Sequence, residues 1–412
     1  MTSVGRSAWK YESMGVSMDA IGERIAALNA RAADAIARGL YFYERPITAI
    51  DGPWVTVANR RMLMMASYSY LGLIGHPDIN RAARDAIDCF GTGTHGVRLL
   101  AGTLTLHREL EDTIARFKQA EGAVVYSSGY VTNLSVISTL VGHGDAVICD
   151  KINHASIVDG CLLSRANFIR FKHNDMADLE RALIKAGSVA KLVVVDAVFS
   201  MDGDIINLPE VSRLCRQYGA WLMVDEAHSL GVLGKTGHGI EEHFGLPPDT
   251  IDIKMGTLSK TIPSVGGYVA GKQDLITYLK NVSRAYIFSA ALPPASVAAA
   301  KAAFDVIERE TWRVEKLHAM EALFLNGLKS LGFDTLRSET TIVPLITGDD
   351  DRAFLMTRGC HQADVFALPV LSPAVPVGLS RLRVTVTAAH EPEHVARALE
   401  VFERAGREAG VI

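Results

Sequence analysis

The stretch "WLMVDEAHS", Trp221 to Ser229, joins a short apolar run to a group of polar side chains. Consecutive apolar residues, in place of alternating ones, are typical of a strand that is covered on both faces of its sheet. The acid Asp225 comes directly after this run, and His228 follows three residues later. An acidic side chain at the end of a buried strand is costly unless a cation or strong hydrogen-bond donors pair with it.

Similar runs recur between residues 90 and 290: "GAVVYSS", "AVICD", "KLVVVDAVFS", "IDIKMGTLSK" and "GGYVAG". Mostly helical stretches separate them, which predicts an α/β domain with a mostly parallel sheet between helices. Ligands of such sheets bind beyond the carboxyl ends of the strands, so the polar residues there are candidates for a site. These residues are Ser128, Gly129, Asp150, His154, Ser200, Asp225, His228, Thr257, Ser259 and Lys260.

Smaller parts are predicted before and after this sheet in the sequence. Apolar residues three and four apart between Ile21 and Leu40 predict an amphipathic helix, and "PWVTVANRRMLMMAS" predicts two short strands. Beyond the Pro293-Pro294 pair, a helical region and the strand-like "IVPLITG" and "SRLRVTVTAAH" predict an α+β domain. The predicted parts are a helical arm over 1–55, a large domain over 56–294 and a C-terminal domain over 295–412.

Composition narrows the function classes. The 412 residues carry 42 basic and 46 acidic side chains, and no basic stripe of the kind that nucleic acid requires. The five cysteines are scattered and never in a C-x-x-C spacing, which argues against disulfides and structural zinc. No signal-like segment and no apolar run of bilayer-spanning length is present. We therefore expect a soluble, cytoplasmic protein with no metal site.

Lys260 and Asp225 suggest a carbonyl cofactor, although each has a plainer interpretation. A lysine forms a Schiff base only as the neutral amine, which burial can produce, but most lysines are solvated surface charges. Asp225 could pair with the protonated pyridine nitrogen of pyridoxal phosphate (PLP), or it could cap a helix beginning near Glu226. His228 could reach the phenolic oxygen of that cofactor, or be a loop histidine without a role.

Two further stretches suit the same cofactor. In "YSSGYVTN", hydroxyls and a glycine precede a predicted helix, as a phosphate site requires, although a plain turn is the alternative. His154 follows another strand end, where an imidazole could stack on a flat ring or could cap a helix.

These blocks, in this order, resemble the α-oxoamine synthases, a family of fold-type I PLP enzymes. The resemblance covers nearly the whole chain, and it implies a large domain built on a seven-stranded sheet with a smaller α+β domain after it. The resembling blocks are "SYSYLGL", "FGTGTHGVRLLAGTLTLHRELE", "YSSGYVTNLSVIS", "NHASIVDG", "VFSMDGD", "VDEAHSLGVLG", "GTLSKTIPSVGGYVAG", "FSAALPP" and "LRVTVTAAH".

The resemblance implies roles for individual residues. Lys260 matches the lysine that binds PLP and moves the Cα proton, Asp225 the partner of the pyridine nitrogen, and His154 the stacking histidine. His228 matches a histidine near the phenolic oxygen and the reacting carbonyl. The cofactor is also expected to contact Ser128, Gly129, Tyr130, Ser200, Thr257 and Ser259, with Ser289 reaching it from a neighbouring subunit, and the substrate to contact Tyr68 and Arg383.

The implied reaction joins a small amino acid to an acyl thioester, from coenzyme A or a carrier protein, in a homodimer with a shared site. The products are an α-amino ketone, CO2 and a thiol. The stretches "VDEAHS" and "FGTGT", together with Tyr68, resemble serine palmitoyltransferases more than the biotin-pathway synthase. An 8-amino-7-oxononanoate synthase or a 2-amino-3-ketobutyrate ligase is the alternative. Leu371 stands where many relatives carry an arginine.

Other classes fit less well. An aminotransferase, aldolase or racemase of the same fold would not need a pocket for an acyl thioester. A non-catalytic subunit would be expected to lack Lys260. A nicotinamide-dependent dehydrogenase would need G-x-G-x-x-G directly after a strand, whereas "GTGTHG" at residues 91–96 follows a predicted helix.

Overall fold

The computed structural model describes residues 19–412, which form two compact units divided between Glu44 and Arg45. In the first unit, α1 spans Ala20–Ala37, in agreement with the amphipathic helix predicted from Ile21. All the other elements belong to the second unit. Among the described residues, no helix is both long and apolar enough to cross a membrane.

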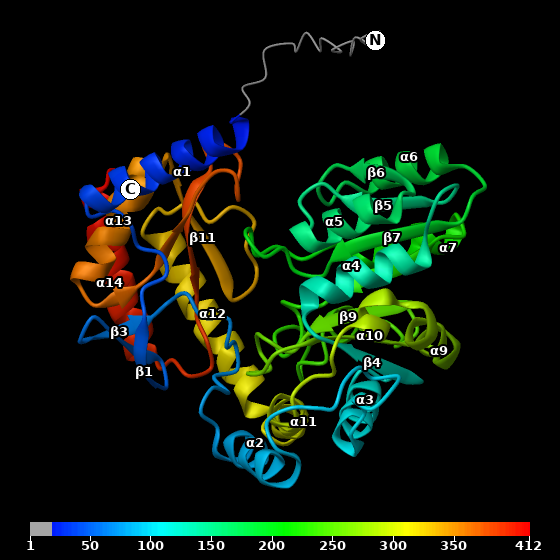
Figure 1. The fold of residues 1–412 in the computed structure, drawn as a ribbon. Coiled ribbons are helices and arrows are strands. Elements are labelled where there is room, and N and C mark those ends of the chain that lie inside the picture. The colour runs from blue at the N-terminus through cyan, green and yellow to red at the C-terminus, as the bar shows by residue number, and fades with distance from the viewer. Residues whose placement is uncertain (1–18) are drawn as a thin grey trace, which may run out of the picture. The chain divides into compact units, whose positions relative to one another are not determined.

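A seven-stranded sheet forms the centre of the second unit (Figure 1). Its strand order is β4-β10-β9-β8-β7-β5-β6, in which β10 runs antiparallel to both of its neighbours and all other pairs are parallel. This confirms the predicted mostly parallel sheet of a fold-type I enzyme. The strands are β4 (Gly122–Tyr126), β5 (Ala146–Asp150), β6 (Asn167–Phe171), β7 (Lys191–Asp196), β8 (Trp221–Asp225), β9 (Ile253–Thr257) and β10 (Gly267–Gly271).

Helices cover both faces of this sheet, as the continuous apolar runs predict. In β7, Val193 and Val195 pack into one apolar cluster with α6 and α7, whereas Leu192 and Val194 pack into another with α4 and α5. On the first face lie α2 (Pro77–Phe90), α3 (Thr105–Phe117), α6 (Met176–Ala186), α7 (Leu208–Gln217), α8 (Ile240–Phe244) and α11 (Pro294–Arg309); on the second lie α4 (Gly129–Leu140), α5 (Ala155–Ser164), α9 (Gln273–Val282) and α10 (Arg284–Phe288).

The smaller part is α+β, as predicted. An antiparallel sheet, β11-β14-β13, packs with helices around an apolar cluster that contains Val384 and Phe402. Leu63 and Met65, from the beginning of the unit, join the same cluster, because β3 pairs in parallel with β12. The elements are β1 (Ile47–Asp51), β2 (Trp54–Val57), β3 (Arg60–Met64), α12 (Trp312–Ser330), β11 (Ile342–Gly348), α13 (Asp350–Gln362), β12 (Val365–Phe366), β13 (Leu368–Val370), β14 (Ser380–Thr385) and α14 (Pro392–Glu408).

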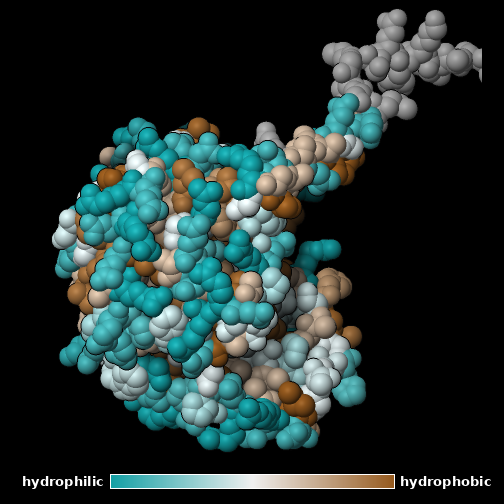
Figure 2. Space-filling view, turned by 90° about the vertical axis from the view of Figure 1, so that its left-hand side faces the viewer, coloured by the Kyte–Doolittle hydropathy of each residue, from teal (hydrophilic) through white to brown (hydrophobic). Residues whose placement is uncertain are grey.

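The surface on the side of α13 and α14 is mainly hydrophilic, with scattered apolar side chains (Figure 2). Single exposed apolar residues are ordinary on a folded protein and do not mark a site. The predicted domain boundaries after residues 55 and 294 stay predictions.

A buried ion pair fixes the loop that follows β8. The Nζ of Lys118 lies 2.7 Å from Glu226 Oε2, and neither side chain is exposed by more than 3%. Glu226 Oε1 also accepts hydrogen bonds from the backbone N–H of Ile240, at 3.1 Å, and from the Ser229 hydroxyl, at 3.2 Å. Paired in this way, the glutamate can be buried, and it ties both ends of the 226–240 loop to one point.

Candidate active site

The predicted site residues of β8 and β9 meet at the carboxyl edge of the sheet. Asp225 ends β8 and Thr257 ends β9, while His228 and Lys260 follow three residues after each of them. The Nζ of Lys260 lies 2.6 Å from Nε2 of His228. Parallel neighbouring strands thus bring an acid, an imidazole and an amine to one place.

Asp225 is a buried carboxylate with well-placed donors. Its Oδ2 accepts a hydrogen bond of 2.7 Å from Nδ2 of Asn133, and its Oδ1 accepts one of 2.9 Å from the backbone N–H of Ala227. Turns follow it, and the next helix, α8, begins only at Ile240. The interpretation of Asp225 as a helix cap is therefore wrong, and its position suits an acid that pairs with a buried cation such as a pyridinium.

Lys260 is half-buried, and its surroundings change its protonation. Burial lowers the pKa of the lysine to about 8, with Arg383 adding to the effect and the charge of Asp225 opposing it. Burial also holds the pKa of His228 well below its usual range, and the charges of Lys260 and Arg383 act in the same direction. A substantial fraction of neutral amine near neutral pH is what a carbonyl-binding lysine requires.

Hydroxyls and a helix N-terminus converge close to Lys260. Ser128 caps α4, accepting from the backbone N–H of Val131, and Gly129 is the first residue of that helix. A Cβ on Gly129 would lie 3.0 Å from Thr257 Oγ1, which itself lies 2.9 Å from Ser259 Oγ. Backbone N–H groups at a helix start, beside two hydroxyls, are the donor set that binds a phosphate. The residues present therefore fit PLP.

His154 both caps a helix and faces the site. Its Nδ1 accepts from the backbone N–H of Ser156, at 3.3 Å, so the capping interpretation is correct. The same imidazole lies edge-on to the Tyr130 ring, with the two ring centroids 6.3 Å apart. The charges of Asp225 and Lys260 act on its pKa in opposite directions. Burial lowers the pKa of His154, partly offset by Asp225. Its capping bond orients the ring without excluding a stacking role.

The predicted substrate residues also reach this place. Arg383 on β14 donates from Nε to the backbone carbonyl of Ser200, at 2.6 Å, and its guanidinium carbon lies 4.7 Å from the centre of the Tyr68 ring. Lys260 Nζ lies 5.7 Å from the same ring. A guanidinium beside the reacting amine can bind a carboxylate. Leu371, by contrast, packs against the apolar cluster of the smaller part.

Ser289 and Tyr130 stand outside the hydrogen-bond network around Lys260. Ser289 follows α10 and lines a small cavity with Tyr126 and Ser127. The Tyr130 hydroxyl donates to Asp159 on α5, and its ring is exposed. The contact predicted for Ser289 with a neighbouring subunit stays a prediction.

Four residues of the site were not among the predicted ones. Asn133 donates to Asp225 and also to the Ser156 hydroxyl, at 2.9 Å, which in turn lies 2.7 Å from His154 Nδ1. Asp196, at the end of β7, accepts from the backbone N–H of His154 at 2.7 Å. The Tyr70 hydroxyl lies 2.6 Å from His228 Nδ1. Position after a strand could have marked Asp196, and spacing of one helical turn from Gly129 could have marked Asn133.

Two other places do not resemble this site. Ligand atoms of His173, Asp202 and Asp204 lie within 4.8 Å of one another, but the two ring nitrogens of His173 already face Asp150, at 3.1 Å, and Asp204, at 2.8 Å. Although burial opposes it, this double pairing raises the pKa of His173 to about 10, and an imidazolium cannot ligate a metal. The prediction that the protein has no metal site stays a prediction.

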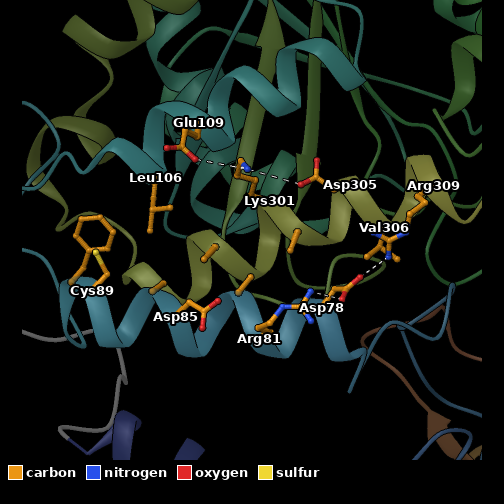
Figure 3. A pocket seen from close by; sticks show the side chains of 15 residues that line it. Asp78, Arg81, Asp85, Cys89, Leu106, Glu109, Lys301, Asp305, Val306 and Arg309 are labelled. Atoms are coloured by element: carbon orange, nitrogen blue, oxygen red, sulfur yellow. Dashed lines mark hydrogen bonds and ion pairs between the residues drawn. The ribbon is translucent and has the colours of Figure 1, made fainter.

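A groove of about 430 Å³ lies between α2, α3 and α11 (Figure 3). Its lining is charged, and the charges pair with one another: Arg309 and Arg81 both bind Asp78, at 2.7 and 2.6 Å, and Lys301 lies 3.8 Å from Glu109. None of the predicted site residues lines it.

Comparison with known proteins agrees with this fold and site. The model of the family "Aminotransferase class I and II" matches residues 60–402. The chain therefore belongs to this family of PLP-dependent enzymes.

Within the family the relatives are more specific. The 8-amino-7-oxononanoate synthase of Geobacter sulfurreducens is 44% identical over 378 residues, covering 91% of this chain and 96% of that protein. The serine palmitoyltransferase of Bacteriovorax stolpii is 42% identical over 368 residues, covering 89% and 87%. A solved structure of serine palmitoyltransferase from S. paucimobilis superposes with a TM-score of 0.92 at 34% identity, covering 95% of this chain and 99% of that one.

Both kinds of relative are α-oxoamine synthases. The chain is a PLP-dependent α-oxoamine synthase, an acyltransferase that condenses an amino acid with an acyl thioester and releases CO2. The predicted family, cofactor and reaction class are confirmed.

Asn133 provides a test of the site geometry. We expect Asn133→Ala to weaken PLP binding by roughly tenfold or more, because a hydrogen bond to a buried charged group is lost and Asp225 and His154 are no longer held together. Absorbance titration of the cofactor-free protein with PLP measures the Kd. The control is Asn281→Ala, since Asn281 is exposed and its Nδ2 bonds only within α9. Equal affinity of the two variants would contradict the assignment.

Proposed function

We propose that Lys260 binds PLP and moves the Cα proton of the amino acid. The observation that supports it is the contact between the half-buried Lys260 amine and His228, at 2.6 Å. The pKa of this amine is lowered to about 8. When bound, PLP supplies an electrophilic aldehyde and a protonated ring that draws electrons from the α-carbon. Asp225 keeps the proton on the pyridine nitrogen, because its buried carboxylate is stabilised by a nearby cation.

The remaining residues bind and orient. Thr257, Ser259 and the N-terminus of α4 would hold the phosphate of PLP, and His154 would orient its ring. Arg383 binds the substrate carboxylate beside the Tyr68 ring. His228 stands next to Lys260 and is within reach of groups on the reacting carbon. Together they would position the substrate next to the amine.

For the substrates, we propose L-serine and a long-chain acyl thioester. The structural match supports this choice, because the serine palmitoyltransferase structure superposes over 95% of the chain at 34% identity. An 8-amino-7-oxononanoate synthase structure from Francisella tularensis covers 84% at 24% identity and a TM-score of 0.74, which supports the fold alone. Sequence favours a second candidate, a synthase of the 8-amino-7-oxononanoate type, because several such proteins are 42 to 45% identical.

Titration of the PLP-loaded enzyme separates the two candidates. We expect L-serine to change the visible absorbance at lower concentration than L-alanine or glycine, and CO2 release to follow when a long-chain acyl-coenzyme A is added. The three amino acids differ only at the side chain, so the ratio of their binding constants reports the pocket. A response to L-alanine at the lowest concentration, with a dicarboxylate-derived thioester as the better acyl donor, would contradict the serine assignment.

We also propose that the enzyme is a homodimer that works in the cytoplasm. The segments 96–100 and 288–291 lie together, because Val97 bridges Ala290 and the backbone N–H of Ala291 donates to Gly96 O. Leu100 on the first segment is 84% exposed and Phe288 next to the second is 73% exposed. Neighbouring exposed apolar side chains favour a protein interface. Among the described residues all five cysteines are unpaired, which suits a reducing compartment.

Charge placed on this face tests the dimer. We expect Leu100→Asp to convert the dimer to a monomer in sedimentation velocity, and to lower kcat by at least about tenfold, because a carboxylate would have to be buried at the interface. Val377→Asp is the matched control, since Val377 is 89% exposed on another loop. A wild-type protein that sediments as a monomer while fully active would contradict the proposal.

A further inference from the structure

Four side chains form a continuous line through the interior of the site. Nη2 of Arg383 lies 3.4 Å from the Tyr70 hydroxyl oxygen. That oxygen lies 2.6 Å from Nδ1 of His228. The other ring nitrogen of His228, Nε2, lies 2.6 Å from Nζ of Lys260. Tyr70 and His228 are both buried, so water does not replace these partners. The line therefore connects the predicted carboxylate-binding arginine to the predicted PLP-binding lysine.

The chemistry of the groups gives the line a direction. A guanidinium has donors and no acceptor, so the Tyr70 oxygen accepts from Arg383. The single phenolic proton is then available for His228, whose Nδ1 accepts it. A neutral imidazole carries one proton, and with Nδ1 accepting, that proton must be on Nε2. It points at Lys260 Nζ, which can accept it only with the lone pair of a neutral amine.

The opposite direction leaves a buried proton unsatisfied. If a Lys260 ammonium donated to Nε2, the proton of His228 would be on Nδ1 and would point at the Tyr70 oxygen. Across the described part of the chain, the Tyr70 hydroxyl contacts only His228 and Arg383, and both would then be donors to it. The phenolic proton would have no acceptor in a buried position, which is unfavourable.

The surroundings of Tyr70 and His228 favour the neutral form of both side chains. Burial raises the pKa of Tyr70 to about 12, so the phenol keeps its proton, although Arg383 opposes this. The groups that face His228 are the cations Lys260 and Arg383, the imidazole of His154 and the rings of Tyr68 and Tyr70. A cationic imidazole would be repelled by its neighbours. Asp225 and Asp196 act on Lys260 instead and favour the ammonium.

We propose that Tyr70 is a positioning residue, whose hydroxyl fixes the proton of His228 on Nε2 so that His228 donates to Lys260 and holds its amine neutral. The inference rests on the proposed role of Lys260 as the amine that captures PLP. It adds a function for a buried tyrosine that touches neither the amine nor the phosphate donors. Through the same line, a carboxylate that draws Arg383 away would loosen the hold on Lys260.

The position of the histidine proton is directly measurable in the cofactor-free protein. We would label histidine with nitrogen-15 and record NMR spectra that link each ring nitrogen to the ring protons, identifying His228 by its absence in His228→Gln. At about pH 9, above the Lys260 pKa of about 8, we expect Nε2 to be protonated and Nδ1 to be bare, and Tyr70→Phe to yield a mixture of both forms. Tyr268→Phe is the matched control, because Tyr268 is equally buried and its hydroxyl has no hydrogen-bond partner among the described residues. A wild-type proton on Nδ1, or identical spectra of wild type and Tyr70→Phe, would overturn the proposal.

The rate of PLP capture by the cofactor-free protein provides a second readout. Neutral amine increases as pH rises through the Lys260 pKa of about 8, so capture should accelerate over that range. If the loss of the Tyr70 hydroxyl raises this pKa by about one unit, Tyr70→Phe captures PLP about tenfold more slowly at pH 7. The two proteins should converge above about pH 10, where the amine is neutral in both.

A purely structural role predicts something different. Tyr70→Phe would then be slower by a similar factor at every pH, and this result would overturn the proposal. If wild type and variant both failed to capture PLP at any pH, the proposed role of Lys260 would be wrong. The histidine spectra would still decide whether Tyr70 sets the proton of His228, so the two failures are distinguishable.

Discussion

The carboxylate of Asp225 and the amine of Lys260 act on each other at the carboxyl edge of the sheet, and the site is built around that pair. Asp225 is 4% exposed, so its charge depends on the donors that Asn133 and Ala227 supply. Lys260 faces the opposite situation, because burial favours its neutral form while Asp225 favours the charged one. The balance between these effects leaves part of the Lys260 amine neutral near neutral pH. Asp225 lies close to it and can pair with a cationic ring.

The fold brings the partners of this pair from distant parts of the sequence. The parallel strands β8 and β9 present Asp225 and Thr257 at the same edge, and α4 starts against them at Gly129. Arg383 comes from β14 of the smaller part and bonds to Ser200 after β7. The smaller part is thus attached to the larger one at the site itself.

Much of this could be predicted from the sequence, because strands covered on both faces need consecutive apolar residues and leave a recognisable end. The edge strand β6 was missed, since the exposed Asn167 and Arg170 leave it no long apolar run. Tyr70 was missed for another reason: its importance lies in a bond to His228, 158 positions away, which no local pattern records. His154 caps α5, as one of its two interpretations states, and its stacking on a flat ring stays a prediction.

The proposed function depends on Lys260 as the residue that binds PLP. The most direct measurement is reduction of the PLP-loaded protein with borohydride, followed by proteolysis and mass spectrometry to locate the pyridoxyl group. We expect one labelled site, Lys260, in a peptide that contains "GTLSK". A label on another lysine, or no label on a protein that is active with PLP, would contradict it.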